Sequence, residues 1–151
     1  MNKLQSCKFV NVLPPVAIND NTAWTTTEID TLGWNHLTVV VNIGATDIAM
    51  AVMKMQSSDT SGSGFADVDG LDTDGDTDVF GSAATLPTAT DDAGVVVFDI
   101  PLSGHKRYWD LAATAGDGAA GAFASAVGIL SRGEESPSTA TEQGTLNTMV
   151  G

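Results

Sequence analysis

The chain has very few basic residues. Among its 151 residues there are 6 Lys and Arg against 19 Asp and Glu, which gives a formal net charge of −13. Proteins that bind nucleic acid neutralise the phosphates with clustered Lys and Arg. The scarcity of bases therefore excludes nucleic acid as the expected partner, and it means that the folded surface must tolerate strong self-repulsion.

Cysteine and long apolar runs are also scarce. Cys7 is the only cysteine, so no disulfide can form within the chain, and a disulfide-stapled secreted domain is excluded. No apolar stretch approaches the length of a membrane span. Residues 1–5 are not followed by the apolar segment of a signal peptide. We therefore expect a protein with no membrane partner that is made in a reducing cytoplasm.

Recognisable catalytic motifs are missing. His36 and His105, the two histidines, have no cysteine or second histidine at ligand spacing, and there is no G-x-S-x-G nucleophile elbow. Segment 116–121 (GDGAAG) matches G-x-G-x-x-G. It lacks the following helix, parallel strand and acidic residue of a dinucleotide-binding fold, which favours a glycine-rich hairpin. We expect no enzymatic activity, no catalytic residue and no cofactor.

Six aspartates are concentrated in one stretch of the chain. They are Asp67, Asp69, Asp72, Asp74, Asp76 and Asp78. Alternating carboxylates can surround Ca²⁺. Counted from Asp72, however, the glycine position of an EF-hand loop is Thr77 and its twelfth position is Ala83. We expect a solvent-facing acidic loop and no dedicated metal site, with a bound cation as the alternative.

What the chain has in quantity is β-forming and turn-forming residues. Short runs rich in Val, Thr and Ile are separated by 16 glycines, which is typical of a β-protein with many turns. No run has convincing helical periodicity, and we expect seven to nine strands. The expected strands are Lys8–Leu13, 22–29, 36–43, 47–56, a weak strand at 64–68, 95–102, 106–114 and Ala122–Ser131, with an extended stretch at 16–18.

Two of these strand predictions make sharper claims. Only residues 44–46 separate strand 36–43 from strand 47–56, so we expect these two strands to be antiparallel neighbours. In the last strand, Phe123, Val127 and Ile129 fall on one face. Regular short strands in this number predict an all-β fold, a single-domain jelly roll or β-sandwich.

The two ends of the chain differ from its middle. We divide it into an N-terminal arm (1–7), a jelly-roll domain (8–131) and a polar C-terminal tail (132–151), with both terminal segments extended. The tail contains Pro137 and few apolar residues, so we expect it to be mobile or to lie along a partner. Segment 57–90 has little periodicity, and a loop of that length in a small domain is usually functional or mobile.

Three segments taken together resemble a known family. Residues 8–18 (KFVNVLPPVAI), 44–49 (GATDIA) and 106–118 (KRYWDLAATAGDG) resemble the capsid cement (decoration) proteins of short-tailed phages, typified by that of a Bordetella phage. The resemblance extends into the tail at 136–144 and includes no catalytic motif. It implies a jelly-roll virion protein on the outer surface of the head. There it would bridge major capsid subunits without covalent bonds, as a homo-oligomer, with a dimer favoured over a trimer.

The few basic residues mark the expected capsid contacts. They are Lys3, Lys8, Lys106, Arg107 and Arg132. Residues 3–13 and 132–151 are extended segments without a core of their own, so we expect both to contact the capsid. Deleting 132–151 should then weaken capsid binding and leave the β-fold intact. Beside the bases, Tyr108 or Trp109 is expected to be an anchor in the core or at an interface.

Two competing functions stay open. The first is another virion structural domain, such as a head fibre, tail spike or adhesin that binds a host glycan. Three tryptophans and one tyrosine are present, and most of them fall in expected strands, which weighs against an exposed aromatic groove for sugar. The second is a small β-sandwich enzyme or a Ca²⁺-binding module.

Overall fold

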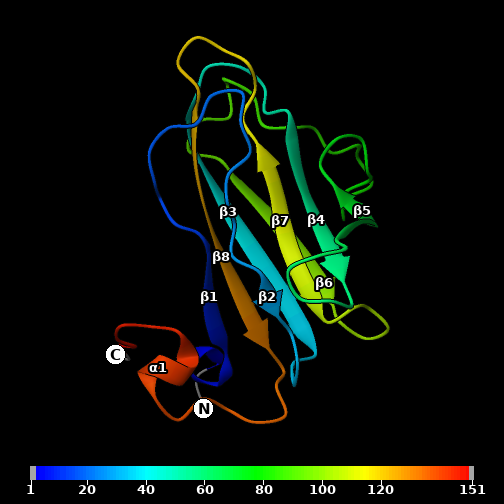
Figure 1. The fold of residues 1–151 in the computed structure, drawn as a ribbon, viewed down its shortest axis with the longest axis vertical. Helices are drawn as coiled ribbons and strands as arrows, with labels where there is room; N and C mark the ends of the chain where they lie inside the picture. The colour runs from blue at the N-terminus through cyan, green and yellow to red at the C-terminus, as the bar shows by residue number, and fades with distance from the viewer. Residues whose placement is uncertain (1–2, 150–151) are drawn as a thin grey trace.

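The protein is a β-sandwich. The computed structural model describes residues 3–149 and contains two antiparallel four-stranded sheets, so the prediction of an all-β fold is confirmed (Figure 1). One sheet has the order β1-β8-β3-β6 and the other has the order β2-β7-β4-β5. The strands are β1 (Lys8–Leu13), β2 (Ile29–Asp30), β3 (His36–Thr46), β4 (Val52–Ser58), β5 (Ala66–Asp72), β6 (Val95–Pro101), β7 (Tyr108–Thr114) and β8 (Ala122–Ser131).

The strands pair in a nested order. β1 pairs with β8, β2 with β7, β3 with β6 and β4 with β5, and the β3–β8 and β4–β7 pairs complete the two sheets. Every connection except the one between β4 and β5 therefore passes from one sheet to the other. The ends of the strands consequently meet at the two ends of the sandwich, where segments distant in sequence become neighbours.

The expectation that segments 36–43 and 47–56 pair with each other is wrong. β3 continues to Thr46 in one sheet, and β4 begins only at Val52 in the other. Residues 47–51 cross between the sheets, and the Met50 amide is held by the carbonyl of Pro87 at 2.8 Å. Each strand has one apolar face, and placing the strands in opposite sheets buries both faces against each other.

Two other segments differ from expectation. Of the strand expected at 22–29, only Ile29 lies in a strand (β2), and residues 22–28 are irregular: the amide of Trp24 donates to the Ala113 carbonyl of β7, and the amide of Thr27 donates to the Val12 carbonyl of β1. This segment closes one side of the sandwich because it forms hydrogen bonds to both sheets. It therefore cannot form a continuous ladder of hydrogen bonds with one strand. Segment 57–90, expected mainly as a loop, contains β5, which extends four residues beyond the weak strand expected at 64–68.

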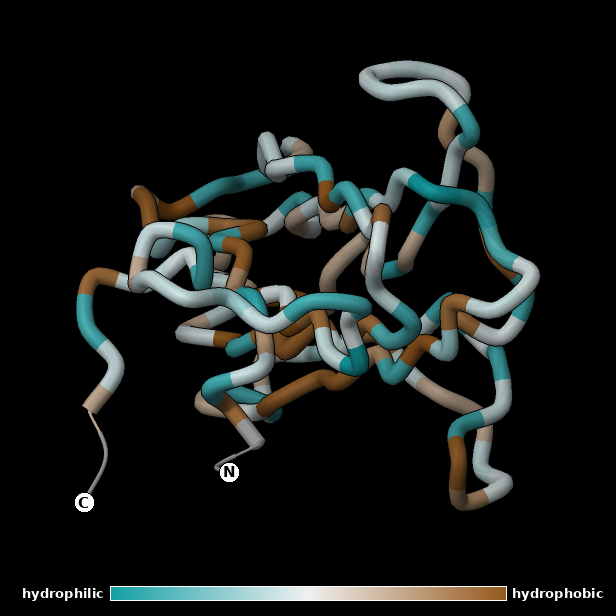
Figure 2. The backbone as a smooth tube through the Cα atoms, turned by 90° about the horizontal axis from the view of Figure 1, so that it is seen from below, coloured by the Kyte–Doolittle hydropathy of each residue, from teal (hydrophilic) through white to brown (hydrophobic). Residues whose placement is uncertain are grey.

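The core lies between the sheets and combines small with large side chains. β8 contributes Ala122, Ala124 and Ala126 to the interior, whereas the facing sheet contributes bulky residues such as Met53 and Trp109. Phe123, Val127 and Ile129 do share a face of β8, and it is the outer one. In Figure 2 the hydrophobic stretches run mainly through the middle of the molecule. Complementary volumes of this kind allow the close packing of protein interiors.

The terminal segments are not extended throughout, because each contains a short helical turn. These are η1 (Lys3–Ser6) and α1 (Ala140–Gln143). Thr139 caps α1 at its start, and Gly144 ends it with a φ of 76°. Gln143 is buried, and its side-chain amide donates to the Leu4 carbonyl at 2.8 Å. The tail therefore packs on the N-terminal segment of its own chain.

Candidate functional site

The basic residues gather at one end of the sandwich. Lys8 opens β1 and lies opposite Leu130 near the end of β8, and Arg132 directly follows β8. Lys106 and Arg107 directly precede β7, and η1, which includes Lys3, lies beside the start of β1 (Figure 1). The sixth base, Lys54, lies within β4. The five positions singled out in the sequence thus belong to the same end of the sandwich, where the described ends of the chain also lie.

Arg107 is fixed by an internal partner. Its Nε and one terminal nitrogen donate to the two carboxylate oxygens of Asp30, each at 2.7 Å, and its guanidinium lies 4.8 Å from the ring centre of Tyr108. The hydrogen bond to Arg107 is the main cause that lowers the pKa of Asp30, and the same bond raises the pKa of Arg107. Asp30 therefore fixes the orientation of the Arg107 side chain and neutralises part of its charge.

Three other bases are not paired in this way. Within residues 3–149, no carboxylate lies within 4 Å of the charged groups of Lys8, Lys106 or Arg132. Lys106 and Arg132 stand in exposed or half-exposed loops. Arg132 also has a φ of 54°, and its carbonyl accepts a bond of 2.9 Å from the Asn35 side chain. The backbone at Arg132 is thereby held while the side chain stays available to a partner.

Trp109 anchors this end of the sandwich. Its side chain is fully buried, and its Nε1–H donates to the Lys106 carbonyl at 3.0 Å. The ring of His105 meets it edge-on at 5.6 Å. Trp109 is thus the core anchor expected of this cluster, while Tyr108 is half-buried. The buried indole fixes the turn that presents Lys106 to solvent.

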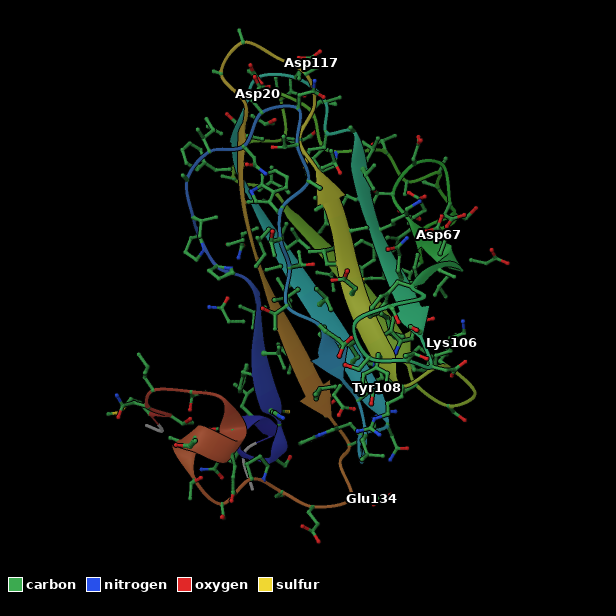
Figure 3. All side chains as sticks on the ribbon, viewed as in Figure 1. Asp20, Asp67, Lys106, Tyr108, Asp117 and Glu134 are labelled. Carbon is green, nitrogen blue, oxygen red and sulfur yellow. The ribbon has the colours of Figure 1, made fainter. Side chains whose placement is uncertain are left out.

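The acidic residues are spread over the molecule, and some share the end that holds the bases. Asp67 and Asp69 line a shallow hollow together with Lys106. Asp20 and Asp117 lie at the end opposite to Lys106, and Asp67 lies on the side formed by β5 (Figure 3). Glu134 is among the acids that do lie at the basic end. The aspartates of the acidic run are exposed or half-exposed, as expected, but Asp67, Asp69 and Asp72 lie in β5 rather than in a loop. The bases, rather than the acids, therefore make the charge distribution uneven.

The glycine-rich segment is the loop between β7 and β8, and because these strands lie in different sheets it crosses the sandwich, so the expectation of a glycine-rich hairpin is wrong. Asp47 accepts hydrogen bonds from the amides of Ala119 and Ala120 at 2.6 and 2.5 Å, and Asp20 accepts one from Gly118 at 3.1 Å. The bonds to Ala120, Gly121 and Ala119 lower the pKa of Asp47. Because internal carboxylates occupy these amides, the loop is not arranged to bind a phosphate, which would need the same donors.

Three carboxylates of the acidic run, those of Asp72, Asp76 and Asp78, cap turns, whereas that of Asp67 binds Lys54 and Gln56. Asp76 accepts from the amide of Asp72 at 2.9 Å, and Asp78 accepts from the amides of Phe80 and Ser82 at 2.9 Å. Within the described residues, no group of three or more His, Cys, Asp or Glu side chains is placed to hold a metal ion. The arrangement fits short acidic turns better than a Ca²⁺ loop, whose carboxylates converge on one point.

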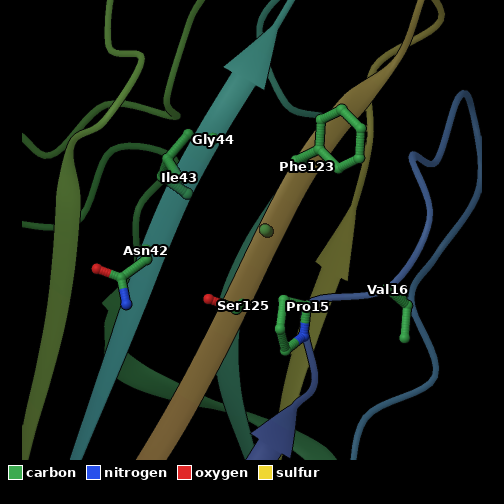
Figure 4. A pocket seen from close by; sticks show the side chains of 8 residues that line it. Pro15, Val16, Asn42, Ile43, Gly44, Phe123 and Ser125 are labelled. Carbon is green, nitrogen blue, oxygen red and sulfur yellow. The ribbon is translucent and has the colours of Figure 1, made fainter.

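An apolar band crosses the outer face of the β1-β8-β3-β6 sheet. Val127, Val40 and Val97 stand side by side in register on β8, β3 and β6, and Val97 and Val127 are exposed. Beside the band, Phe123 and Pro15 line a shallow hollow of about 420 Å³ (Figure 4). The sequence indicated the outer residues of β8 by their alternation. It did not indicate Val97, because the run VVVF has no alternation.

Comparisons of the chain with protein-family models, with curated proteins and with solved structures find no match. No helix in the described part of the chain is long and apolar enough to cross a membrane.

Proposed function

We propose that this protein is a capsid cement protein. It binds the outside of a phage head and bridges neighbouring major capsid subunits by non-covalent contacts. The observation that supports the proposal best is the gathering of Lys3, Lys8, Lys106, Arg107 and Arg132 at one end of a protein of net charge −13. Lys8, Lys106 and Arg132 make no salt bridge within the described residues, so at this end they can pair with acidic groups of a partner.

The mechanism needs no chemistry. A ligand that binds the assembled shell and not its separated subunits stabilises the shell by RT ln(1 + [L]/Kd). Many copies on one lattice add their modest contacts together, and an oligomer that engages several subunits at once gains further through effective concentration. The net negative charge favours the outer side of the shell, away from packaged DNA.

The topology supports the jelly-roll part of this proposal. Nested pairing of β1 with β8, β2 with β7, β3 with β6 and β4 with β5 is the pattern obtained when one long antiparallel ribbon is wound into two sheets. Such double-sheet folds are common among viral capsid domains. A fold is shared by many functions, so this likeness supports the proposal less than the charge distribution does.

A glycan-binding adhesin is less well supported. Sugar sites present aromatic rings to solvent, whereas Trp24 and Trp109 are buried and Trp34 is partly buried against the core. We therefore keep the cement function as the proposal and use the adhesin as an outcome of its test.

The test is to add the purified protein to emptied heads assembled from the major capsid protein encoded in the same genome. We expect saturable cosedimentation and added density on the outer surface in electron microscopy. A variant that lacks residues 132–151 should bind more weakly and keep its β-type circular dichroism. If this variant binds as tightly as the full chain, the tail does not contact the capsid. Density at a tail structure, with bare heads, would refute the cement function and favour the adhesin.

A further inference from the structure

β6 forms an edge of its sheet, and among residues 3–149 β3 is the only strand that pairs with it. The amide of Ile43 donates to the Gly94 carbonyl, and the amide of Leu102 donates to the Asn35 carbonyl. In an antiparallel ladder, hydrogen-bonded pairs occur at every second residue. Between these two bonds, Val96, Phe98 and Ile100 must therefore bond to β3, so the backbone groups of Val95, Val97 and Asp99 point away from the sheet.

The free edge opens into a groove. A hollow of about 430 Å³ is lined by β6 residues, among them Val95, Val97 and Asp99, and by the segment that follows β5. Val95 and Val97 are each more than half exposed. Long apolar edges are usually blocked by lysine, bulges or a covering segment because they invite pairing with another chain. On β6 only Asp99 and Pro101, near one end, serve this purpose.

A small hairpin stands on the other side of the groove. The amides of Ala84 and Asp78 donate to the carbonyls of Asp76 and Ser82, and Thr77 and Ala83 form a β-bridge. At its tip, Val79 and Phe80 are each 90% exposed and line the same groove. The Asp78 carboxylate accepts a hydrogen bond from the amide of Phe80, so the conformation of this apolar tip is fixed.

The groove is acidic as well as apolar. Asp72, Asp76, Asp78 and Asp99 line it, and no Lys or Arg does. Lys54 and His36 approach two of these carboxylates, at 3.7 Å from Asp72 and 3.3 Å from Asp99. The other acids keep the groove negative, so two copies of this chain joined edge to edge through β6 would bring their carboxylates together, which is unfavourable.

We propose that β6 and the hairpin of residues 75–84 form a docking groove for an extended, cationic segment of a partner protein. The segment adds as an antiparallel strand to the backbone of Val95, Val97 and Asp99, in the mode known as β-augmentation. Its apolar side chains contact Val79, Phe80 and Val97, and its Lys or Arg side chains meet the surrounding carboxylates. This groove is separate from the basic end, and the inference does not depend on the cement function.

The probe is a labelled, end-blocked peptide of alternating valine and lysine, about eight residues long so that it spans β6 at roughly 3.3 Å per residue. Fluorescence anisotropy should show saturable binding at low salt. N-methylation of the alternate residues whose N–H groups face β6 should weaken binding about tenfold or more, since it removes several hydrogen bonds. Replacing lysine with glutamate should abolish binding. Equal binding of the N-methylated peptide would overturn the strand-addition mode, and equal binding of the glutamate peptide would overturn the cationic partner.

The matched protein variants are Val97→Pro and Val97→Thr. The N–H of Val97 faces the groove, so proline there removes a donor for the partner and leaves the β3 ladder intact. Threonine keeps the donor and the volume. We expect about tenfold weaker peptide binding for Val97→Pro and a change of less than about threefold for Val97→Thr. Urea unfolding tests whether both variants fold. If one of them does not, the N-methylated peptide decides the question on the unaltered protein.

Sedimentation of the protein alone distinguishes the competing occupant. A dimer that Val97→Pro converts to monomer would show that a second copy covers β6, which would overturn the cationic-segment proposal.

Discussion

Asp30 and Arg107 join the last residue of β2 to the residue before β7 through two parallel hydrogen bonds of 2.7 Å. Both side chains are nearly half exposed, so the pair adds at most about 1 kcal/mol to stability. Its main effect is geometric, because it fixes the turn from which Lys106 projects. The charges available to a partner at this end are therefore those of Lys8, Lys106 and Arg132.

Lys106→Gln should weaken binding to phage heads. Loss of one exposed charge at an interface corresponds to about fivefold in affinity, and the effect should fade at high salt. Lys54→Gln is the matched control, since Lys54 lies within β4, away from the basic end. Cosedimentation with heads at low and high salt measures both. Equal losses for the two variants would show that the basic end has no special role.

The stability of the protein should decrease in acid partly through Asp47. Backbone amides, first that of Ala120, lower the pKa of Asp47 below its usual 3.8. A carboxylate with a lowered folded-state pKa contributes stability above its unfolded pKa and loses that contribution as the pH falls through the folded pKa. The urea concentration at the midpoint of unfolding should therefore decrease when the pH is lowered below about 4.

Asp47→Asn tests this dependence directly. The variant should have a lower urea midpoint than the unaltered protein at neutral pH, and the difference should shrink as the pH falls through the lowered folded-state pKa of Asp47. Asp69→Asn is the control, because Asp69 is exposed and has no side-chain hydrogen bond within the described residues. A difference that stays constant across the whole pH range would contradict the role given to the Asp47 carboxylate.

Two buried tryptophans should respond differently to replacement by phenylalanine. Trp109 donates to the Lys106 carbonyl, whereas Trp24 Nε1 is buried without a hydrogen-bond partner in the described residues. Trp109→Phe leaves a carbonyl without its partner, and Trp24→Phe removes an unsatisfied donor. Urea unfolding should therefore show Trp109→Phe to be more destabilising by about 1–3 kcal/mol. The reverse order would mean that packing, not hydrogen bonding, decides these sites.

Two glycines with nearly equal backbone angles separate strain from crowding. Gly121 and Gly104 have φ values of 80° and 83°. A Cβ at Gly121 would lie 2.2 Å from the Asn19 carbonyl oxygen, whereas a Cβ at Gly104 meets nothing within 4 Å. Gly104→Ala should cost about 1 kcal/mol, and Gly121→Ala about 1–3 kcal/mol more. Equal costs in thermal or urea unfolding would indicate that the β7–β8 loop shifts freely.

The sequence predicts the first and last strands of the fold well. β1 and β8 have the bounds expected, because Pro14 ends the first and alternation runs through the second. It fails where tertiary hydrogen bonds decide the path. Residues 22–29 look like a strand by composition, yet bond to β1 and β7 together. The length of a link also cannot tell whether two strands pair in one sheet or face each other across a core.

The sequence predicts which residues belong to the candidate site, but it does not predict that they lie at the same end of the fold. Bases are so few that Lys106, Arg107 and Arg132 stand out in the sequence. Arg132 lies near Lys8 because the end of β8 pairs with the start of β1, whereas Lys106 and Arg107 reach this end through the start of β7, which pairs with the end of β2. The internal partner of Arg107 is Asp30, which lies 77 residues away in the chain. The groove at β6 was missed because exposure of an edge depends on the order of strands.

The nested strand pairing sets the folding kinetics. Only β4 and β5 are partners close in sequence, whereas β1 must find β8 near the other end of the chain. Closing such distant contacts costs chain entropy before any of them stabilises the structure, so folding should take milliseconds to seconds or longer. Because β8 pairs with both β1 and β3, a chain still under synthesis lacks the strand that completes the first sheet. The first sheet can therefore be completed only after β8 has been made.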